Sequence, residues 1–135
     1  IPCPRYGSSQ DCPEPPPGES VDYDIISPIG THGGINMPIC RHSKPYPSPV
    51  ATWRAGETVQ VKFVTGATHG GGHCQFALSY DDGDTFVVIH DRLRHCFFDD
   101  SDNLDPNFDI PLPADLPGSD KVVFAWGWNN ALGNR

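Results

Sequence analysis

The sequence contains no long hydrophobic run and no segment with the apolar spacing of an amphipathic helix. A helix that spans a bilayer needs roughly 20 consecutive apolar residues, so we expect no membrane partner. Basic residues are also few, since 9 Lys and Arg stand against 17 Asp and Glu, for a net charge of −8. Proteins bind nucleic acid through cations that neutralise phosphates, and this balance therefore argues against a nucleic-acid partner.

Sequence motifs of nucleophilic catalysis are missing as well. Ser79 and Ser101 do not lie in a nucleophile elbow, and no glycine-rich phosphate-binding motif precedes a helical segment. Pairs of carboxylates occur at 81–82 and 99–100, but both lie in predicted turns, where solvation is the default. Hydrolysis through an activated serine or a phosphate-binding loop is therefore not expected.

Proline (15) and glycine (14) are abundant instead, which favours turns and extended chain over helices. Most of the prolines fall in residues 1–56, which have no periodicity but do carry scattered Tyr and Ile anchors. We expect one domain over residues 1–135, in which segment 1–56 wraps around a core formed by residues 57–135. Polar and apolar residues alternate from Thr58 to Phe63, as in a half-buried strand.

Further strands are predicted at 74–80, 85–90, 108–110 and 121–128, with a hairpin turn at 81–84 because Asp-Gly supports positive φ. Short strands separated by turn signals predict an all-β fold, an antiparallel β-sandwich with long proline-rich loops. Trp126 and Trp128 lie on one face of the last strand and are expected in the core. Trp53 fits either a planar surface for a sugar ring or a lid on the core.

Five cysteines are many for a cytosolic domain of this length, and none forms a Cys-x-x-Cys pair. Disulfides in an oxidising compartment are therefore favoured over a zinc ribbon or a thioredoxin-like site, and we predict a secreted, extracellular protein. The odd count leaves two alternatives, a free buried thiol or a cysteine whose partner lies outside these 135 residues.

The segment from His69 to His73 places three glycines between two imidazoles. Glycine permits unusual backbone conformations and close approach of another group, and neutral imidazole is a ligand for zinc, copper, nickel or iron. One interpretation is a metal site that uses both histidines, or either one with a partner elsewhere. The alternative is a tight crossover with ordinary polar histidines, because this spacing in a loop lacks the helix that aligns two rings.

Two segments carry a resemblance to a known family. Residues 68–81 read Thr-His-Gly-Gly-Gly-His-Cys-Gln-Phe-Ala-Leu-Ser-Tyr-Asp, and residues 124–135 read Phe-Ala-Trp-Gly-Trp-Asn-Asn-Ala-Leu-Gly-Asn-Arg. Together they resemble fungal lytic polysaccharide monooxygenases, most closely the chitin-active type and its secreted relatives in early-diverging fungi. The resemblance is good over residues 50–135. It implies an immunoglobulin-like or fibronectin III-like sandwich.

The resemblance also implies one copper ion in a histidine brace, made by an N-terminal histidine and one internal imidazole. His69 matches the internal ligand, Gln75 and Arg135 are expected near the metal, and His73 becomes a neighbour that supports the ligand. Reduced by an external electron donor, such a copper site activates dioxygen or peroxide and oxidises chitin or cellulose. The implied partners are a polysaccharide surface and the electron donor, and a monomer is expected.

By the same resemblance, Cys74 pairs with Cys96, Cys3 pairs with Cys12, and Cys40 pairs outside the chain. The chain starts at Ile1 and stops at Arg135, without the N-terminal brace histidine and without the glutamate, tyrosine and cysteine that follow in the family. We therefore expect a fragment of a longer protein. A non-catalytic sandwich of the same ancestry, which binds polysaccharide or copper without turnover, is the alternative function.

Overall fold

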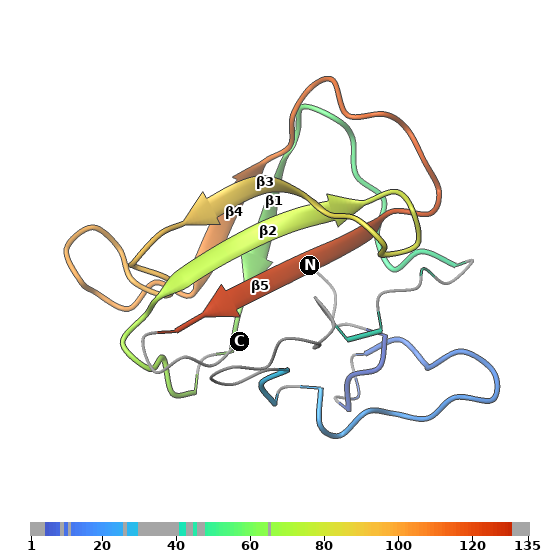
Figure 1. Cartoon of the computed structure of the whole chain (residues 1–135), viewed down its shortest axis with the longest axis horizontal. Helices are drawn as coiled ribbons and strands as arrows, with labels where there is room; N and C mark the ends of the chain where they lie inside the picture. The colour runs from blue at the N-terminus through green and yellow to red at the C-terminus, as the bar shows by residue number, and fades with distance from the viewer. Residues whose placement is uncertain are drawn as a thin grey trace.

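The described residues of the computed structural model contain two antiparallel sheets, preceded by a long segment without strands (Figure 1). The structure describes residues 5–8, 10, 12–25, 27–29, 41, 42, 45, 48–64 and 66–130. Within them, β1 (Thr58–Lys62) pairs with β4 (Asn107–Pro111), and β2 (His73–Ser79) lies between β3 (Val87–Arg92) and β5 (Val123–Asn129). None of the described segments forms a helix long and apolar enough to cross a membrane.

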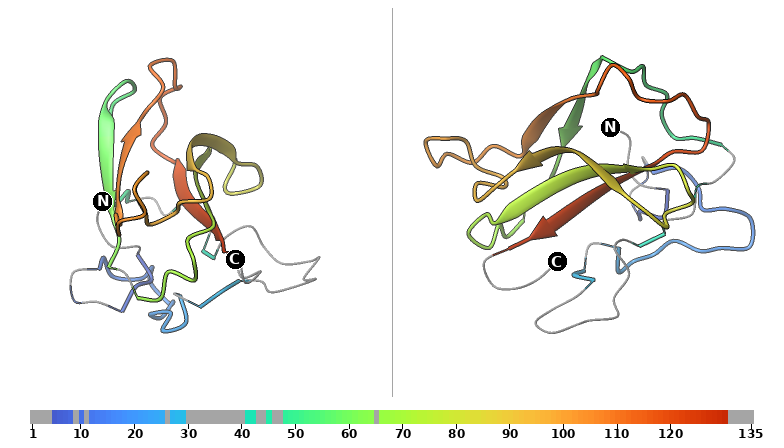
Figure 2. Two further views of the ribbon diagram at one scale, coloured as in Figure 1. Left: turned by 90° about the vertical axis from the view of Figure 1, so that its left-hand side faces the viewer. Right: turned by 45° about the horizontal axis from the view of Figure 1, so that its top comes forward.

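The core lies between the two sheets, which form separate layers in Figure 2. Val59 and Val61 alternate with exposed polar residues along β1, as the sequence predicted, and they pair with Ile110 and Phe108 of β4. Phe76 of β2 is fully buried and its ring lies 4.9 Å from that of Phe108, centroid to centroid. Fully burying such an apolar side chain contributes about 1.5–3 kcal/mol. The predicted all-β sandwich is confirmed.

Aromatic side chains of β5 complete this core. Trp126 and Trp128 are partly buried and pack against it, as predicted, with their rings stacked at 6.0 Å. Trp53 also packs against the core, where its ring meets Phe124 edge to face at 5.1 Å. The contacts of Trp53 therefore match a core lid rather than an open sugar-stacking surface.

The hairpin between β2 and β3 is longer than predicted. Asp82 and Gly83 both have positive φ (59° and 88°), as expected for the Asp-Gly turn. The returning strand, however, begins at Val87 instead of Thr85 and continues to Arg92. The reason is that the Asp81 carboxylate accepts hydrogen bonds from the Thr85 backbone N–H (2.9 Å) and hydroxyl (2.6 Å), which keep Thr85 in the turn.

Those hydrogen bonds also predict a pH dependence of stability. The Thr85 hydroxyl, the Thr85 N–H and then the Ser79 hydroxyl lower the pKa of Asp81 to about 2. Because the unfolded value is about 3.9, the stabilisation is present above that pH and is lost as the pH falls towards 2. We expect Asp81→Asn to lose less unfolding free energy than the wild type between about pH 5 and 2.5. Urea titrations at both pH values measure this, with Asp82→Asn as the control. Equal losses in the wild type and Asp81→Asn would contradict the role of the carboxylate.

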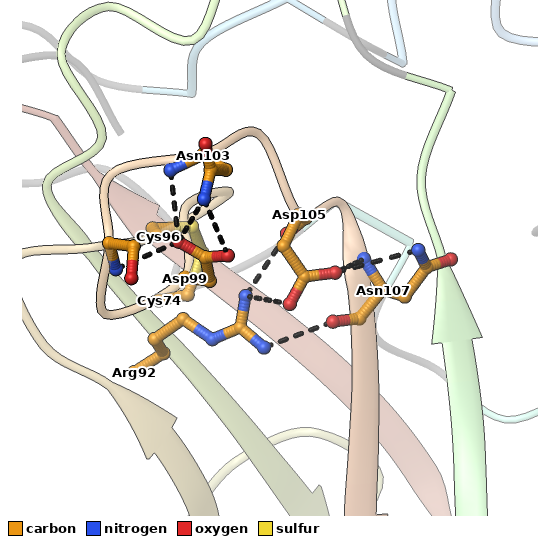
Figure 3. A network of polar contacts seen from close by, with 8 residues as sticks. Cys74, Arg92, Cys96, Asp99, Asn103, Asp105 and Asn107 are labelled. Carbon is orange, nitrogen blue, oxygen red and sulfur yellow. Dashed lines mark hydrogen bonds and ion pairs between the residues drawn. A yellow bond between two sulfur atoms is a disulfide. The ribbon is translucent and has the colours of Figure 1, made fainter.

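Arg92 connects the two sheets at the end that carries the triglycine loop (Figure 3). Its guanidinium donates to the backbone carbonyls of Asp105 and Asn107, both at 3.0 Å, and lies 3.2 Å from the Asp105 carboxylate. The same group stacks 4.0 Å above the centre of the Phe108 ring. β3 of one sheet is thereby held to the start of β4 in the other.

The described parts of the proline-rich segment form turns and extended chain. The Asp22 backbone N–H donates to the Tyr6 carbonyl (2.9 Å), and the Tyr6 hydroxyl donates to the Glu19 carboxylate (2.8 Å). Cys12 is disulfide-bonded. Its predicted pairing with Cys3, the prediction for Cys40 and the role of Arg135 concern residues outside the described part of the chain. The single-domain organisation stays a prediction.

Candidate metal site at the triglycine loop

The backbone of the triglycine loop is left-handed over four consecutive residues. The φ angles of His69, Gly70, Gly71 and Gly72 are 47°, 73°, 81° and 86°. The Gly71 N–H donates to the Thr68 carbonyl at 2.9 Å and closes the turn. Glycine adopts such angles freely, whereas a histidine does so rarely and at a cost of about 1–3 kcal/mol. The fold therefore holds His69 in a conformation that its side chain does not favour.

Gly71 and Gly72 also allow other groups to come close to the loop, and these groups are backbone segments of the protein. A Cβ on Gly71 would lie 3.0 Å from the Arg94 carbonyl oxygen and 3.2 Å from that of Cys96. A Cβ on Gly72 would overlap the Asn129 carbonyl oxygen and lie 2.6 Å from the Asn130 Cα. The groups that come close are thus the backbone of the segment after β3 and the end of β5.

That segment is joined to the loop by three further contacts. The Cys96 N–H donates to the Gly72 carbonyl at 3.2 Å, and the Arg94 N–H donates to Nδ1 of His73 at 3.2 Å. Cys74 and Cys96 form the predicted disulfide, with a Cα–Cα distance of 5.3 Å, and both are fully buried (Figure 3). The loop is therefore anchored at its C-terminal end, at His73 and the residues on either side of it.

The Asp99 carboxylate fixes the fold of the adjoining turn, 99–103. It accepts hydrogen bonds from the backbone N–H groups of Asn103 (2.9 Å) and Ser101 (2.8 Å), and these bonds, with the Asn103 side chain, lower the pKa of Asp99. A carboxylate so held stays ionised and shapes a turn, as its position in a predicted turn suggested. It is not a proton donor at neutral pH.

His69 is a metal-ligand candidate with an accessible imidazole. Its side chain is exposed, and neither ring nitrogen hydrogen-bonds to any described residue. Its ring lies 5.9 Å from that of Trp128, and the Trp128 indole N–H donates to the Gly71 carbonyl at 2.6 Å. An exposed imidazole with both nitrogens available fits the role of a ligand to copper or a similar ion.

The other predicted site residues are placed differently. His73 is also exposed, but its Nδ1 accepts the hydrogen bond from the Arg94 N–H, so this histidine links two loops. Gln75 is exposed on β2 and pairs with Asp91 and Gly127, and it makes no hydrogen bond or ring contact with His69. Within the described ranges no three His, Cys, Asp or Glu side chains converge as a metal-binding group. The described part of the site therefore contributes one imidazole, and the roles of His73 and Gln75 stay predictions.

Trp128 is the residue at this site that sequence reasoning treated only as core. Its contact with the loop joins positions 57 residues apart, which no local pattern reveals. The available signal was the alternation of apolar residues along β5. Trp128 pairs with Cys74, and the two side chains therefore project from the same face of the sheet, next to the loop.

No protein-family model matches the chain. Curated relatives do match, and one of them, AA11 family lytic polysaccharide monooxygenase A of Aspergillus fumigatus, is 36% identical over 120 residues, covering 88% of this chain and 51% of that protein. AA11 family lytic polysaccharide monooxygenase B of another A. fumigatus strain is 32% identical over 102 residues (66% and 24%). The AA11 family enzyme of Aspergillus oryzae is 31% identical over 93 residues (59% and 22%). The chain spans about half the length of the first relative and about a quarter of the other two.

Proposed function

This chain is homologous to the AA11 family lytic polysaccharide monooxygenases over most of its length, and on that basis we propose that it acts as a secreted, copper-dependent monooxygenase that cleaves a polysaccharide oxidatively. The observation that carries the proposal is His69. It is the first histidine of the His-Gly-Gly-Gly-His loop, it is exposed, and its two ring nitrogens have no hydrogen-bond partner among the described residues.

His69 would provide one imidazole ligand to copper, and the resemblance implies that an N-terminal histidine would complete the brace. Copper, when bound, supplies the oxidising chemistry that acts on a C–H bond of the glycosidic linkage. The residues of this chain hold the ligand in place. The turn closed by Gly71 N–H and the disulfide of Cys74 with Cys96 fix the loop at both ends.

The substrate we propose is chitin or cellulose, presented as a solid surface. The net charge of −8 disfavours a polyanionic polysaccharide, and a neutral one is therefore the better candidate. An external reductant supplies the electrons. Gln75 and Arg135 act near the metal in this proposal.

Incubation of the copper-loaded protein with chitin and with cellulose, in the presence of a reductant, tests the function. We expect soluble oligosaccharides that carry an oxidised end on one of the two substrates, detected by mass spectrometry, and none without reductant. The His69→Ala variant serves as the matched control and is expected to release none. A protein that binds the polysaccharide and yields no oxidised product in any condition would instead be the non-catalytic sandwich.

A further inference from the structure

His69 itself has an incomplete set of supporting contacts. Histidines that bind metals almost always donate their second ring N–H to a carbonyl, a carboxylate or water, which fixes the orientation of the ring. No such hydrogen bond joins His69 to the described residues. Among the described residues its ring contact is with the indole of Trp128, at 5.9 Å between centroids and an interplanar angle of 33°. Within the described part of the chain, the contact that can fix the orientation of the imidazole is therefore the one with the Trp128 ring.

Trp128 is well fixed for that purpose. On its inner side the indole packs edge to face on Phe97 (5.1 Å) and stacks with Trp126 (6.0 Å). Its backbone belongs to β5 and pairs with Cys74, a disulfide cysteine at the start of β2. The ring therefore has little freedom to move relative to the sheet.

The indole N–H of Trp128 also determines the shape of the loop. It donates to the carbonyl of Gly71 at 2.6 Å, and the backbone N–H of Gly71 donates to the Thr68 carbonyl at 2.9 Å. Both polar groups of Gly71, two residues after His69, are thus engaged. One side chain consequently fixes the backbone that carries His69 and flanks the imidazole as well.

We propose that Trp128 is a positioning residue, which orients the His69 imidazole for copper through its N–H bond to Gly71 and its ring contact. This inference rests on the proposed copper site. Loss of a residue that supports a metal ligand typically lowers metal affinity by about 10–100-fold. Trp128 touches the ligand and the loop but is not itself a ligand, because an indole N–H offers no lone pair to a metal.

The test compares Trp128→Phe with Trp126→Phe. Both variants lose an indole N–H from β5, but that of Trp126 donates to the Cys74 sulfur at 3.2 Å, inside the core. We expect Trp128→Phe to weaken Cu(II) binding by about 10-fold in competition titrations, and Trp126→Phe, which keeps an aromatic ring against Trp128, to have a much smaller effect. In the metal-free protein, the NMR signals of the His69 ring are expected to shift in Trp128→Phe alone. Replacing Trp128 by benzothienylalanine, which keeps the bicyclic ring without the N–H, provides a second variant with smaller packing changes.

The outcomes separate the two proposals. Unchanged copper affinity and unchanged His69 signals in Trp128→Phe and in the benzothienylalanine variant, with affinity lost in His69→Ala, would overturn the positioning role and leave the copper site intact. Equal loss in Trp126→Phe and Trp128→Phe would also overturn it, since the effect would then be general to β5. Unchanged affinity in His69→Ala itself would overturn the copper site, and the positioning role with it.

Discussion

Replacement of His69 by alanine is expected to weaken Cu(II) binding at least about 100-fold, because loss of a ligand exceeds the 10–100-fold effect of losing a residue that only supports one. His69 and His73 are both exposed, but His69 is the one whose ring nitrogens have no hydrogen bond to a described residue. Its removal leaves no comparable donor in the loop, since Nδ1 of His73 is engaged by the Arg94 N–H. Isothermal titration of the purified protein with Cu(II), in a buffer of known copper affinity, measures the change.

His73→Ala is the matched control, because it removes an imidazole four residues away in the same segment. We expect a loss of affinity no larger than about 10-fold, caused by a loosened connection between His73 and Arg94. A protein in which His73→Ala abolished copper binding and His69→Ala did not would reverse the assignment of the ligand.

A second large effect is expected from Gly72→Ala, which should destabilise the fold by about 2–5 kcal/mol. The φ of Gly72 is 86°, which costs an L-residue about 1–2 kcal/mol. The new methyl group would also overlap the Asn129 carbonyl oxygen and lie 2.6 Å from the Asn130 Cα, both of them backbone atoms that cannot rotate away. Chemical denaturation of the variant and the wild type gives the difference in unfolding free energy.

Gly70→Ala distinguishes crowding from backbone strain. Gly70 has nearly the same φ, 73°, but a Cβ there would meet no atom within 4 Å. We therefore expect it to lose only about 1–2 kcal/mol. Equal destabilisation by the two substitutions would show that the close approach of Asn129 and Asn130 is unimportant.

Much of the fold could be predicted from the sequence because its signals are local. The alternation from Thr58 to Lys62 and the Asp-Gly turn at Gly83 each act within a few residues, and the structure has both. The disulfide of Cys74 with Cys96 was predicted through a family resemblance and is confirmed. The start of β3 was wrong by two residues because the Asp81 carboxylate holds Thr85 in the turn. Alternation alone carries no information about such a side-chain cap.

The site was less accessible to sequence reasoning, because it depends on contacts between distant segments. The three glycines suggested room for a metal, whereas Gly71 and Gly72 make room for the backbone at 94–96 and 129–130. The pattern could not distinguish His69 from His73 by spacing. Their difference lies in the Arg94 N–H, 21 residues beyond His73, and in the ring of Trp128. Tertiary contacts of this kind have no periodic signal in the chain.

The most direct test of the central claim, that His69 is a copper ligand, is the EPR spectrum of the protein loaded with one equivalent of Cu(II). The account predicts a single Cu(II) species with nitrogen hyperfine structure in the wild type, and loss of that signal in His69→Ala. Selective ¹⁵N labelling of histidine should change the hyperfine pattern of the wild type, because an imidazole nitrogen binds the metal. An identical spectrum in the wild type and His69→Ala would contradict the claim.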